Sequence, residues 1–568
     1  MTDCEWIQCI CIVDFDIGVG QVIEQVYPQS TNLTDTERTN ICYLAFPDSN
    51  STGSNLGDTK FHISLRTNSA LSPHQRIYNR ECQPHLKADL GHYWGYVYFR
   101  QVKDATSKRG YFQKSFVLIT RLPFHNFFYE LIHRWAPAYF TSGLSALEQG
   151  FEQITSWPRL ATNSQLQLHI LGSVYQIYIP AAANRTASES TANDTEDVTN
   201  NNSTPGTIPI SINSPNEIDV FGPLHTIIHH VQLMWELVLL GEPLVIIATS
   251  PTDSSHIVQA LTSLIHPLEY HAEVYPYFTI HNTEFREFAG ASIPPPSVIL
   301  GVTNPYFAKT LQSWPHTVRI SEPLQINHNS ENPVPHRKLE RVSLQKFLND
   351  TTGSIYTQHK PLLQKDKTLV KKILNGVKTR RPTAVQSVIL RRYFLELTQS
   401  FMIPLERMMS TLMPLAKDIS AFRAPPVPAP FKEDTFLGTL ELSGPHLTST
   451  VKGDYEALYK KFFRSVNFRG WYESRRMEQL EKLEALHQEA LANENLRKWI
   501  VGKQEVEIVD LILCIKQKLH LPVTSNSTLT PPEPTIHVTI KKDIRDQLMK
   551  QLDELMNCLP EDLKMILH

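Results

Sequence analysis

Few residues of this sequence have the types and spacing that bond-making chemistry needs. His225, His229 and His230 fall within one predicted helix, and the first two, four residues apart, could present two imidazoles to a zinc ion. No HExxH glutamate accompanies them, which favours core or surface histidines. The chain also has no GxSxG turn for a nucleophilic serine and no cysteine in a recognisable nucleophile context. We therefore predict no bond chemistry, no catalytic residues and no metal.

The glycines are equally poor candidates for binding a nucleotide cofactor. Gly18-Val19-Gly20 lacks the third glycine of a dinucleotide-binding loop, so it predicts a hairpin turn instead. An apolar strand predicted at residues 244–248 is followed by Thr249-Ser250-Pro251, which resembles a helix cap more than a phosphate loop. We expect no cofactor.

Cysteines and apolar runs bear on the compartment. The seven cysteines show no CxxC spacing, so we interpret them as reduced, mostly core residues. Acidic residues stand near the start, where a signal peptide would carry bases. The most apolar stretch, residues 231–248, is interrupted by Glu236, Glu242 and Pro243. These features predict a cytoplasmic protein without a transmembrane segment.

Charge is balanced over the whole chain but not along it. With 54 Lys and Arg against 57 Asp and Glu, the net charge is −3, which gives no general attraction to nucleic acid. Residues 360–392 are strongly basic, and Asp366 is their only acid. A solvated helix face is the favoured interpretation, and contact with anionic lipid or with an acidic partner is the functional alternative. The candidates for such a patch are Lys371, Lys372, Arg380 and Arg381.

The elements of the first 180 residues are read from apolar periodicity. Alternating or β-branched runs predict one antiparallel sheet, with strands at 6–14, 20–27, 61–65, 93–102 and 111–119. The spacing of large apolar residues predicts a helix over 124–135 that covers one sheet face and ends before Pro137. Residues 166–179 fit two short strands or one bent strand.

A change of pattern follows. Residues 181–216 hold almost no bulky apolar side chain, which predicts a disordered insert. Beyond it, buried-type strands alternate with helices, which predicts a parallel α/β sheet. Its predicted helices cover 224–240 and 253–265, and its strands 244–248, 275–280 and 297–301.

From about Arg337 the pattern is predominantly helical. Residues 384–413 predict a helix with a kink or break at Pro404, and 477–500 an amphipathic helix rather than a coiled coil. A polyproline segment at 425–430 and a proline-containing break near 521–535 separate helical blocks.

Three segments carry a resemblance to a known family. GEPLVIIATSP at 241–251, VYPYFTIHNTEF at 274–285 and VILGVTNPYF at 298–307 resemble the central module of DENN-domain proteins. DFDIGVGQVIEQVYP at 14–28 and WGYVYF at 94–99 look like the upstream module. GDYEALYKKFFRSVNFRGWY at 453–472 resembles the small DENN-only subfamily numbered six, formerly a "family with sequence similarity" group.

The resemblance implies a domain order that agrees with the pattern of elements. We expect a longin-like antiparallel-sheet lobe at 1–180, the insert at 181–216 and a Rossmann-like α/β lobe without a nucleotide fingerprint at 217–335. A downstream helical module is expected at 336–465, and C-terminal helices at 466–568.

The resemblance also implies a function, guanine-nucleotide exchange on a Rab-type small GTPase in endosomal recycling traffic, with peripheral recruitment to recycling endosomes. The GTPase is expected to dock across the first two lobes. Our candidates for its contacts are the turns after two strands, Ser250, Pro251, Thr303, Asn304 and Pro305, although such residues also simply shape loops. By contrast, Tyr277, Phe278, Phe285 and Tyr306 are predicted to be core.

Two other functional classes remain open. A non-catalytic effector or tether would use the same fold to bind the GTP form of a Rab. A cofactor-dependent α/β enzyme is disfavoured by the missing phosphate loop.

Overall fold

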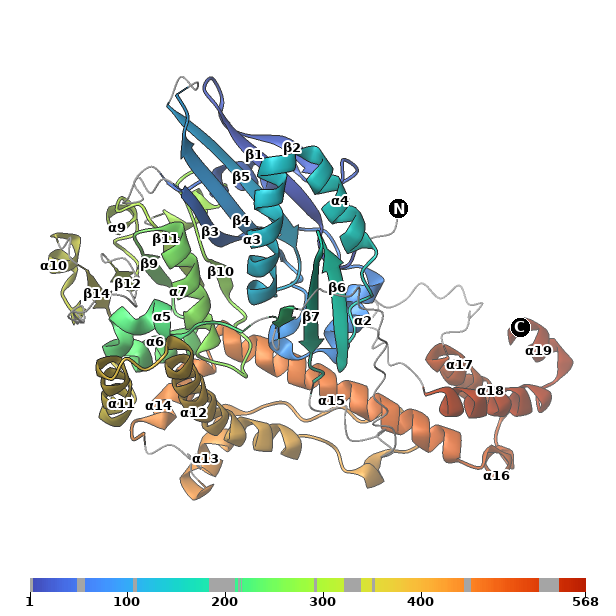
Figure 1. Cartoon of the computed structure of the whole chain (residues 1–568). Coiled ribbons are helices and arrows are strands. Elements are labelled where there is room, and N and C mark those ends of the chain that lie inside the picture. Colours follow the sequence, from blue (N-terminus) through green and yellow to red (C-terminus); the bar gives the residue numbers. More distant parts are fainter. Residues whose placement is uncertain are drawn as a thin grey trace. The chain divides into compact units, whose positions relative to one another are not determined.

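The computed structural model describes most of the chain, and the chain divides into two compact units. The described residues are 4–48, 57–105, 110–182, 210–212, 215, 217–290, 294–320, 339–349, 353–443, 451–519 and 541–567. The first unit comprises Met1–Gln399 and Leu447–Asn467, and the second comprises Ser400–His446 and Phe468–His568. Figure 1 shows the elements by label.

The described N-terminal residues form the predicted antiparallel sheet. Its strand order is β2-β1-β5-β4-β3. The strands are β1 (Cys9–Asp16), β2 (Gly20–Tyr27), β3 (Gly57–Arg66), β4 (His92–Lys103) and β5 (Tyr111–Thr120). Alternate residues of β1 enter two different cores, Cys9 and Cys11 on one face and Ile10 and Ile12 on the other, as the period of a strand requires.

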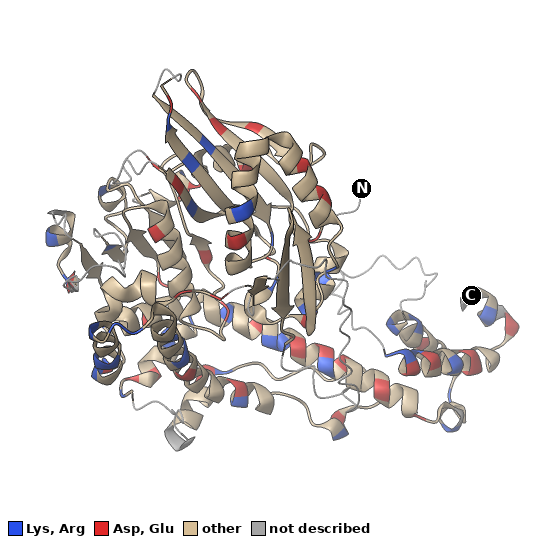
Figure 2. Cartoon of the chain, viewed as in Figure 1, with Lys and Arg blue, Asp and Glu red and all other residues tan. Residues whose placement is uncertain are grey.

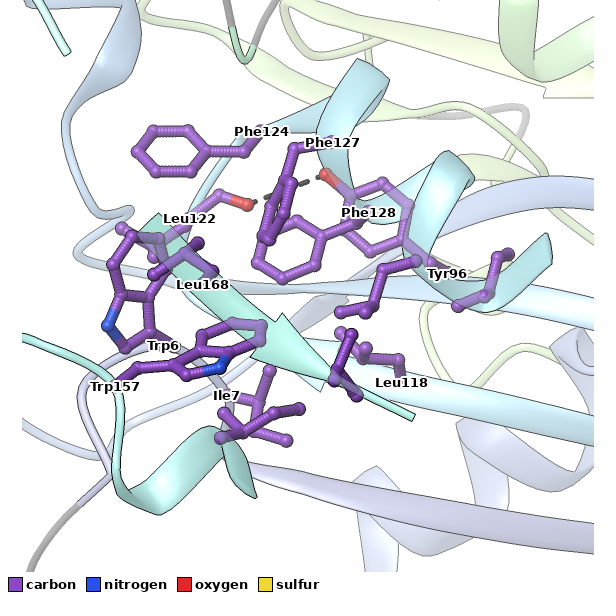
Figure 3. Close-up of a cluster of buried hydrophobic side chains, with 14 of the residues drawn as sticks. Trp6, Ile7, Tyr96, Leu118, Leu122, Phe124, Phe127, Phe128, Trp157 and Leu168 are labelled. Carbon is purple, nitrogen blue, oxygen red and sulfur yellow. Dashed lines mark hydrogen bonds between the residues drawn. The ribbon is translucent and has the colours of Figure 1, made fainter. Parts of the chain in front are cut away.

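Helices cover both faces of this sheet. One core face packs under α1 (Asp35–Leu44), which starts at a capping box: Thr34 Oγ1 accepts from the Glu37 amide at 3.2 Å, and Glu37 Oε2 accepts from the Thr34 amide at 2.8 Å. The other face packs under α3 (His125–Ser142) and α4 (Leu144–Thr155). Figure 3 shows part of this second core, including the rings of Trp6, Phe127 and Trp157.

Helix α3 is longer than predicted. The sequence pattern ends it before Pro137, but the helix continues through this proline to Ser142. Proline cannot donate to the carbonyl of His133, four residues earlier, and His133 lies on the exposed side, where water can solvate that carbonyl. The buried Trp135 and Ala136 fix the neighbouring turn on the sheet.

A smaller sheet and short helices complete this region. Strands β6 (Ser164–Ile170) and β7 (Ser173–Ile179) form a hairpin, which resolves the alternative of one bent strand. Strand β8 (Ile210–Ile212) pairs parallel to β7, so these three residues of the predicted disordered insert are ordered. Most of that insert lies outside the described residues. The short helices are α2 (Pro73–Glu81) and η1 (Pro84–Leu86).

The second sheet of the described residues is six-stranded and mixed, in the order β10-β11-β9-β12-β14-β13. Its first four strands run parallel, the arrangement that was predicted: β9 (Leu244–Ile247), β10 (Glu273–Tyr275), β11 (Val298–Val302) and β12 (His316–Arg319), the last of which was not among the predicted strands. The strand predicted at 275–280 shares only Tyr275 with β10, which begins at Glu273 and stops before Pro276, because proline cannot donate to the ladder. Gly241, Glu242 and Pro243 lead into β9.

The sheet also recruits residues that were predicted to be helical. Strand β14 (Ser354–Thr357) pairs antiparallel with β12, and β13 (Glu340–Arg341) pairs parallel with β14. The predominantly helical part therefore begins after β14, not at Arg337. A four-residue strand is too short to show a period in the sequence.

The helices around this sheet follow the predicted order with one change. Residues 221–239 are three successive pieces: α5 (Phe221–Leu224), the 3-10 helix η3 (His225–His230) and α6 (Val231–Leu239). Helix α7 (Pro251–Ser263) covers the sheet next to β11. Short helices follow at α8 (Phe285–Phe288), α9 (Phe307–Thr310) and α10 (Leu344–Asn349).

The remaining helices of the first unit are α11 (Lys367–Lys378), α14 (Tyr455–Phe462) and the first part of α12 (Thr383–Thr411). Helix α12 continues through Pro404, so the helix does not break at this proline. Asn467, at the end of this unit, is fully buried and ties it together. Its Nδ2 donates to the carbonyls of Val238 (2.8 Å) and Leu239 (3.0 Å), and its Oδ1 accepts from the His271 amide (2.8 Å).

The second unit has its own apolar core among the described residues. It is formed by the end of α15 (Val466–Asn493) with α16 (Leu496–Ile500), α17 (Glu505–Lys518) and α18 (Lys542–Asn557). Helix α19 (Glu561–Leu567), α13 (Glu433–Ser443) and η4 (Ala416–Asp418) complete it. The predicted break near 521–535 lies outside the described residues.

Candidate functional site where the two sheets meet

The two large sheets of the first unit are joined through buried polar side chains. Tyr277, just after β10, is fully buried against the ring of Phe61 on β3, with ring centroids 5.4 Å apart. Its hydroxyl accepts from the amide of Asp48 at 2.7 Å and donates to the carbonyl of Phe46 at 3.3 Å. Burial raises the pKa of this tyrosine. The hydroxyl therefore stays neutral and can both donate and accept.

Three of the predicted contact residues lie at this junction. Thr303 and Asn304 follow β11 and are buried, whereas Pro305 is exposed. Asn304 Nδ2 donates to Asp48 Oδ2 at 3.2 Å, and its Oδ1 accepts from the Tyr306 amide at 2.9 Å. The Asn-Pro turn is thus anchored by a side chain to the segment that follows α1.

The other two predicted residues cap α7 at the same edge. Ser250 Oγ accepts from the amide of Asp253 at 3.1 Å, and Pro251 occupies the first turn, where its missing N–H has no partner to lose. The adjacent Thr252 donates to the carbonyl of Lys60 at 2.9 Å. Strands β9 and β11 are parallel neighbours, so the loops after them share one edge. The structure therefore brings the five candidates together.

A second set of contacts closes the junction on its other side. Arg66 of β3 donates from Nε to Glu273 Oε1 at 3.0 Å and from Nη1 to Glu287 Oε2 at 2.7 Å. This guanidinium lowers the pKa of the Glu287 carboxyl. Asn40 of α1 donates to Glu284 Oε2 at 3.2 Å. Two elements of the first sheet region thus contact β10, α8 and the residue that precedes α8.

Histidines fill the interior of the same junction. His62 Nδ1 lies 2.8 Å from the Tyr129 hydroxyl, and the His62 ring packs on that of His125, with centroids 4.7 Å apart. Burial lowers the pKa of His62 well below its usual value and that of His125 to about 3. The pair is therefore neutral at physiological pH, and the junction carries no buried imidazolium there.

One prediction at this site is wrong, and some contact residues were missed. Tyr306 was predicted to be core but is 54% exposed, because the Asn-Pro turn before α9 directs it outward. Asp48 and Lys60 meet the turns after β9 and β11 from more than 190 positions away in sequence. No local signal in the sequence marks a contact across that separation.

The remaining predicted positions lie elsewhere. Lys371 and Lys372 are exposed on α11, Arg380 is exposed in the turn that follows it, and the half-buried Arg381 donates to Gln386 Oε1 at 3.4 Å. His225, His229 and His230 occupy a 3-10 helix rather than the predicted α-helix, and His230 Nε2 lies 2.9 Å from the Leu339 carbonyl. Within the described ranges, no three metal-ligating side chains gather at one point.

The fold and site define a mixed α/β protein in which an N-terminal antiparallel sheet is joined to a second, mixed sheet. Sequence comparison adds the family. The chain is 44% identical to Protein DENND6A of Mus musculus over 566 residues, 99% of this chain and 90% of that protein. It is 44% identical to Protein DENND6B of Mus musculus over 567 residues (99% and 93%) and 31% identical to the Dictyostelium discoideum DENND6 homolog over 581 residues (91% and 77%). A family profile described as the DENND6 C-terminal domain matches residues 496–568. This chain belongs to the DENND6 family, which confirms the resemblance seen in the sequence.

Proposed function

We propose that this protein is a guanine-nucleotide exchange factor that promotes GDP release from a Rab-family small GTPase. The observation that carries the proposal is its membership of a DENN-domain family along nearly its whole length. We propose that the antiparallel sheet region is a longin-like lobe, that the mixed sheet is a Rossmann-like lobe, and that the helical modules expected at 336–465 and 466–568 follow them in the sequence.

Nucleotide exchange needs no nucleophile in the exchange factor, which agrees with the prediction that this chain has no catalytic residues. A small GTPase holds GDP through its phosphate loop, Mg²⁺ and ordered switch segments. A partner that binds the nucleotide-free form best weakens nucleotide binding by the same factor by which nucleotide weakens the partner, because the two equilibria are linked. Such a partner needs a rigid, shaped surface.

We propose that the GTPase docks at the junction of the two sheets. The half-buried Ser250 and the exposed Pro305 support this because they lie on loops at one sheet edge. Pro251, Thr303 and Asn304 are buried, so they shape these loops rather than face a partner. Tyr306 adds a large exposed ring beside them. Exposed tyrosines are frequent anchors of protein interfaces.

The test is release of fluorescent GDP from a panel of purified Rab proteins, with the full chain titrated in. We expect faster release from one or a few Rabs, and Tyr306→Ala should lower that acceleration about tenfold or more. Tyr178→Ala, an exposed tyrosine of β7, is the matched control and should leave it unchanged. A flat panel at saturating chain would reject exchange activity.

The second candidate function is that of an effector or tether. It would bind the GTP form of a Rab in preference to the empty form, whereas an exchange factor shows the reverse order. Measuring affinity for the two forms of each Rab separates the candidates.

We further propose a cytoplasmic protein recruited peripherally to recycling endosomes. Among the described residues, no helix has the length and apolar character needed to cross a bilayer.

A further inference from the structure

Helices α11 and α12 follow each other in the sequence and are linked through one buried side chain. Gln386 of α12 is fully buried and donates from Nε2 to the Ile373 carbonyl of α11 at 3.0 Å. Gly376 allows this approach, since a Cβ there would lie 2.3 Å from Gln386 Nε2. The start of α12 is therefore held close to α11 in the first unit.

The outward side of α11 is cationic. Lys371, Lys372 and Lys378 are exposed at helical spacing, and the buried side holds Leu369, Val370 and Ile373. Figure 2 shows Lys and Arg on this helix and on the neighbouring part of α12. Within the described residues, none of these three lysines forms an ion pair. Their charges are therefore not neutralised by the protein.

The outward side of α12 next to them is largely apolar. Val385, Val388 and Leu395 are 46%, 54% and 39% exposed and recur at positions that share one face of a helix. Arg392, on the same face, has a side chain that is 80% exposed and donates to Glu396 at 3.0 Å. An exposed apolar stripe thus lies beside an exposed cationic one.

The turn between the helices places an arginine in a backbone conformation that glycine adopts more easily. Helix α11 ends in a Schellman motif, in which the Arg381 amide donates to the Gly376 carbonyl (2.8 Å) and the Arg380 amide to that of Val377 (3.0 Å). Arg380 takes the left-handed position of this motif, with φ of 53°. Glycine is favoured there, so a charged side chain is kept at a cost in conformational energy.

We propose that this α11–α12 face, formed by Lys371, Lys372, Lys378, Arg380, Val385 and Val388, binds the surface of an anionic lipid bilayer. The cations would lie at the headgroups while the valines enter the interfacial layer, the two contributions that interfacial binding combines. An acidic protein is the less suitable partner, because stable protein interfaces cover roughly 800 Å² per partner and three separated apolar side chains offer much less. A fluid bilayer needs no such shaped surface. This proposal does not depend on exchange activity.

The test is co-sedimentation of the full chain with vesicles of phosphatidylcholine, with or without ~30 mol% phosphatidylserine, at low salt. We expect binding to the anionic vesicles only, weakening as the salt concentration rises and the Debye length shortens. Lys371→Glu with Lys372→Glu should lower partitioning by at least about 20-fold, since each base near the surface contributes a factor of roughly five. Val385→Ser with Val388→Ser should lower it about three- to tenfold through lost apolar insertion.

The matched control is Lys542→Glu with Lys550→Glu, two exposed lysines of α18 that change the net charge equally. Partitioning that falls as much in this control as in the α11 variant would overturn the proposal, because net charge alone would then explain binding. Wild-type chain that fails to bind anionic vesicles would also overturn it and would leave an acidic protein as the occupant of this face. GDP release measured without vesicles should be unchanged in the α11 variant, so failure of either proposal can be recognised separately.

Discussion

At the scale of single residues, Asn467 joins segments that are far apart in the sequence. Replacing it by alanine removes both donors to the carbonyls of Val238 and Leu239 and the acceptor for the His271 amide. Because these backbone groups lie in a buried site, we expect Asn467→Ala to lower the free energy of unfolding of the first unit by about 1–3 kcal/mol. Hydrogen exchange of the α6 amides would measure it, with the exposed Asn375→Ala as the control. Equal protection in both variants would refute this role.

Replacing Arg380 by glycine should stabilise the fold locally, whereas the Asn467 variant destabilises it. Its backbone lies in the left-handed region that glycine adopts without strain. Arg380→Gly is therefore expected to raise the free energy of opening of the α11 end by about 0.5–1 kcal/mol, while Arg380→Ala should leave it nearly unchanged. Amide exchange in α11 reports the difference. A glycine variant that is less stable than wild type would contradict the conformational argument.

How far single residues could be predicted from the sequence depends on the range of their contacts. The cap formed by Ser250 and Pro251 is a local pattern, and the structure shows it where the sequence indicates helix entry. Asp48 could not be found this way, because its partners, Asn304 and Tyr277, meet it only after both sheets have formed. Tyr306 was misjudged because composition alone does not report which way a turn directs a ring.

At the scale of elements, the packing of α11 on α12 depends on the missing side chain at Gly376. Alanine normally stabilises a helix interior relative to glycine by about 0.5–1 kcal/mol. At Gly376 its Cβ would meet the buried, hydrogen-bonded Gln386, so we expect Gly376→Ala to destabilise the helix pair by about 1–3 kcal/mol. Gly438→Ala in α13 is the control, because the space around that glycine is open and the sign should reverse. Chemical denaturation of both variants measures the effect; stabilisation by Gly376→Ala would refute close packing.

Long elements were predicted well from the sequence, and short ones were not. Strands β1 to β5 are each eight residues or longer and rich in β-branched or aromatic side chains, so their sheet was expected. Strands β8, β13 and β14 have two to four residues each and are held by their neighbours rather than by a pattern of their own. Helix α3 passes Pro137 for the same kind of reason, since burial of Trp135 outweighs one lost hydrogen bond.

At the scale of the whole first unit, the buried histidines predict sensitivity to acid. The folded-state pKa of His62 and His125 lies below the unfolded value of about 6.5, so below pH 6.5 the unfolded chain binds protons that the folded chain does not. Stability is therefore complete above pH 6.5 and falls as the pH drops below it, by about 1.4 kcal/mol per pH unit for each histidine, and for His125 the loss continues to its folded-state pKa of about 3. The groups around the pair include Tyr96, Tyr129 and His256, which carry no compensating negative charge.

Amide exchange of β3 and α3 between pH 7.5 and 5, corrected for the intrinsic pH dependence of exchange, would measure this slope. His62→Gln with His125→Gln should flatten it by about 3 kcal/mol per pH unit. The exposed His133→Gln should leave it unaltered. A slope that persists without both buried histidines would assign the acid sensitivity to other groups.

The position of Asn467 also orders events during translation. The ribosome emits residues 400–446, which belong to the second unit, before the last piece of the first unit appears. Until residue 467 has emerged, the carbonyls at the end of α6 and the His271 amide lack their partner. A nascent chain that stalls in this interval exposes an incomplete first unit, which is the kind of state that chaperones bind. A premature stop at about residue 446 should therefore impair folding of the first unit, although it leaves the junction of the two sheets intact in sequence.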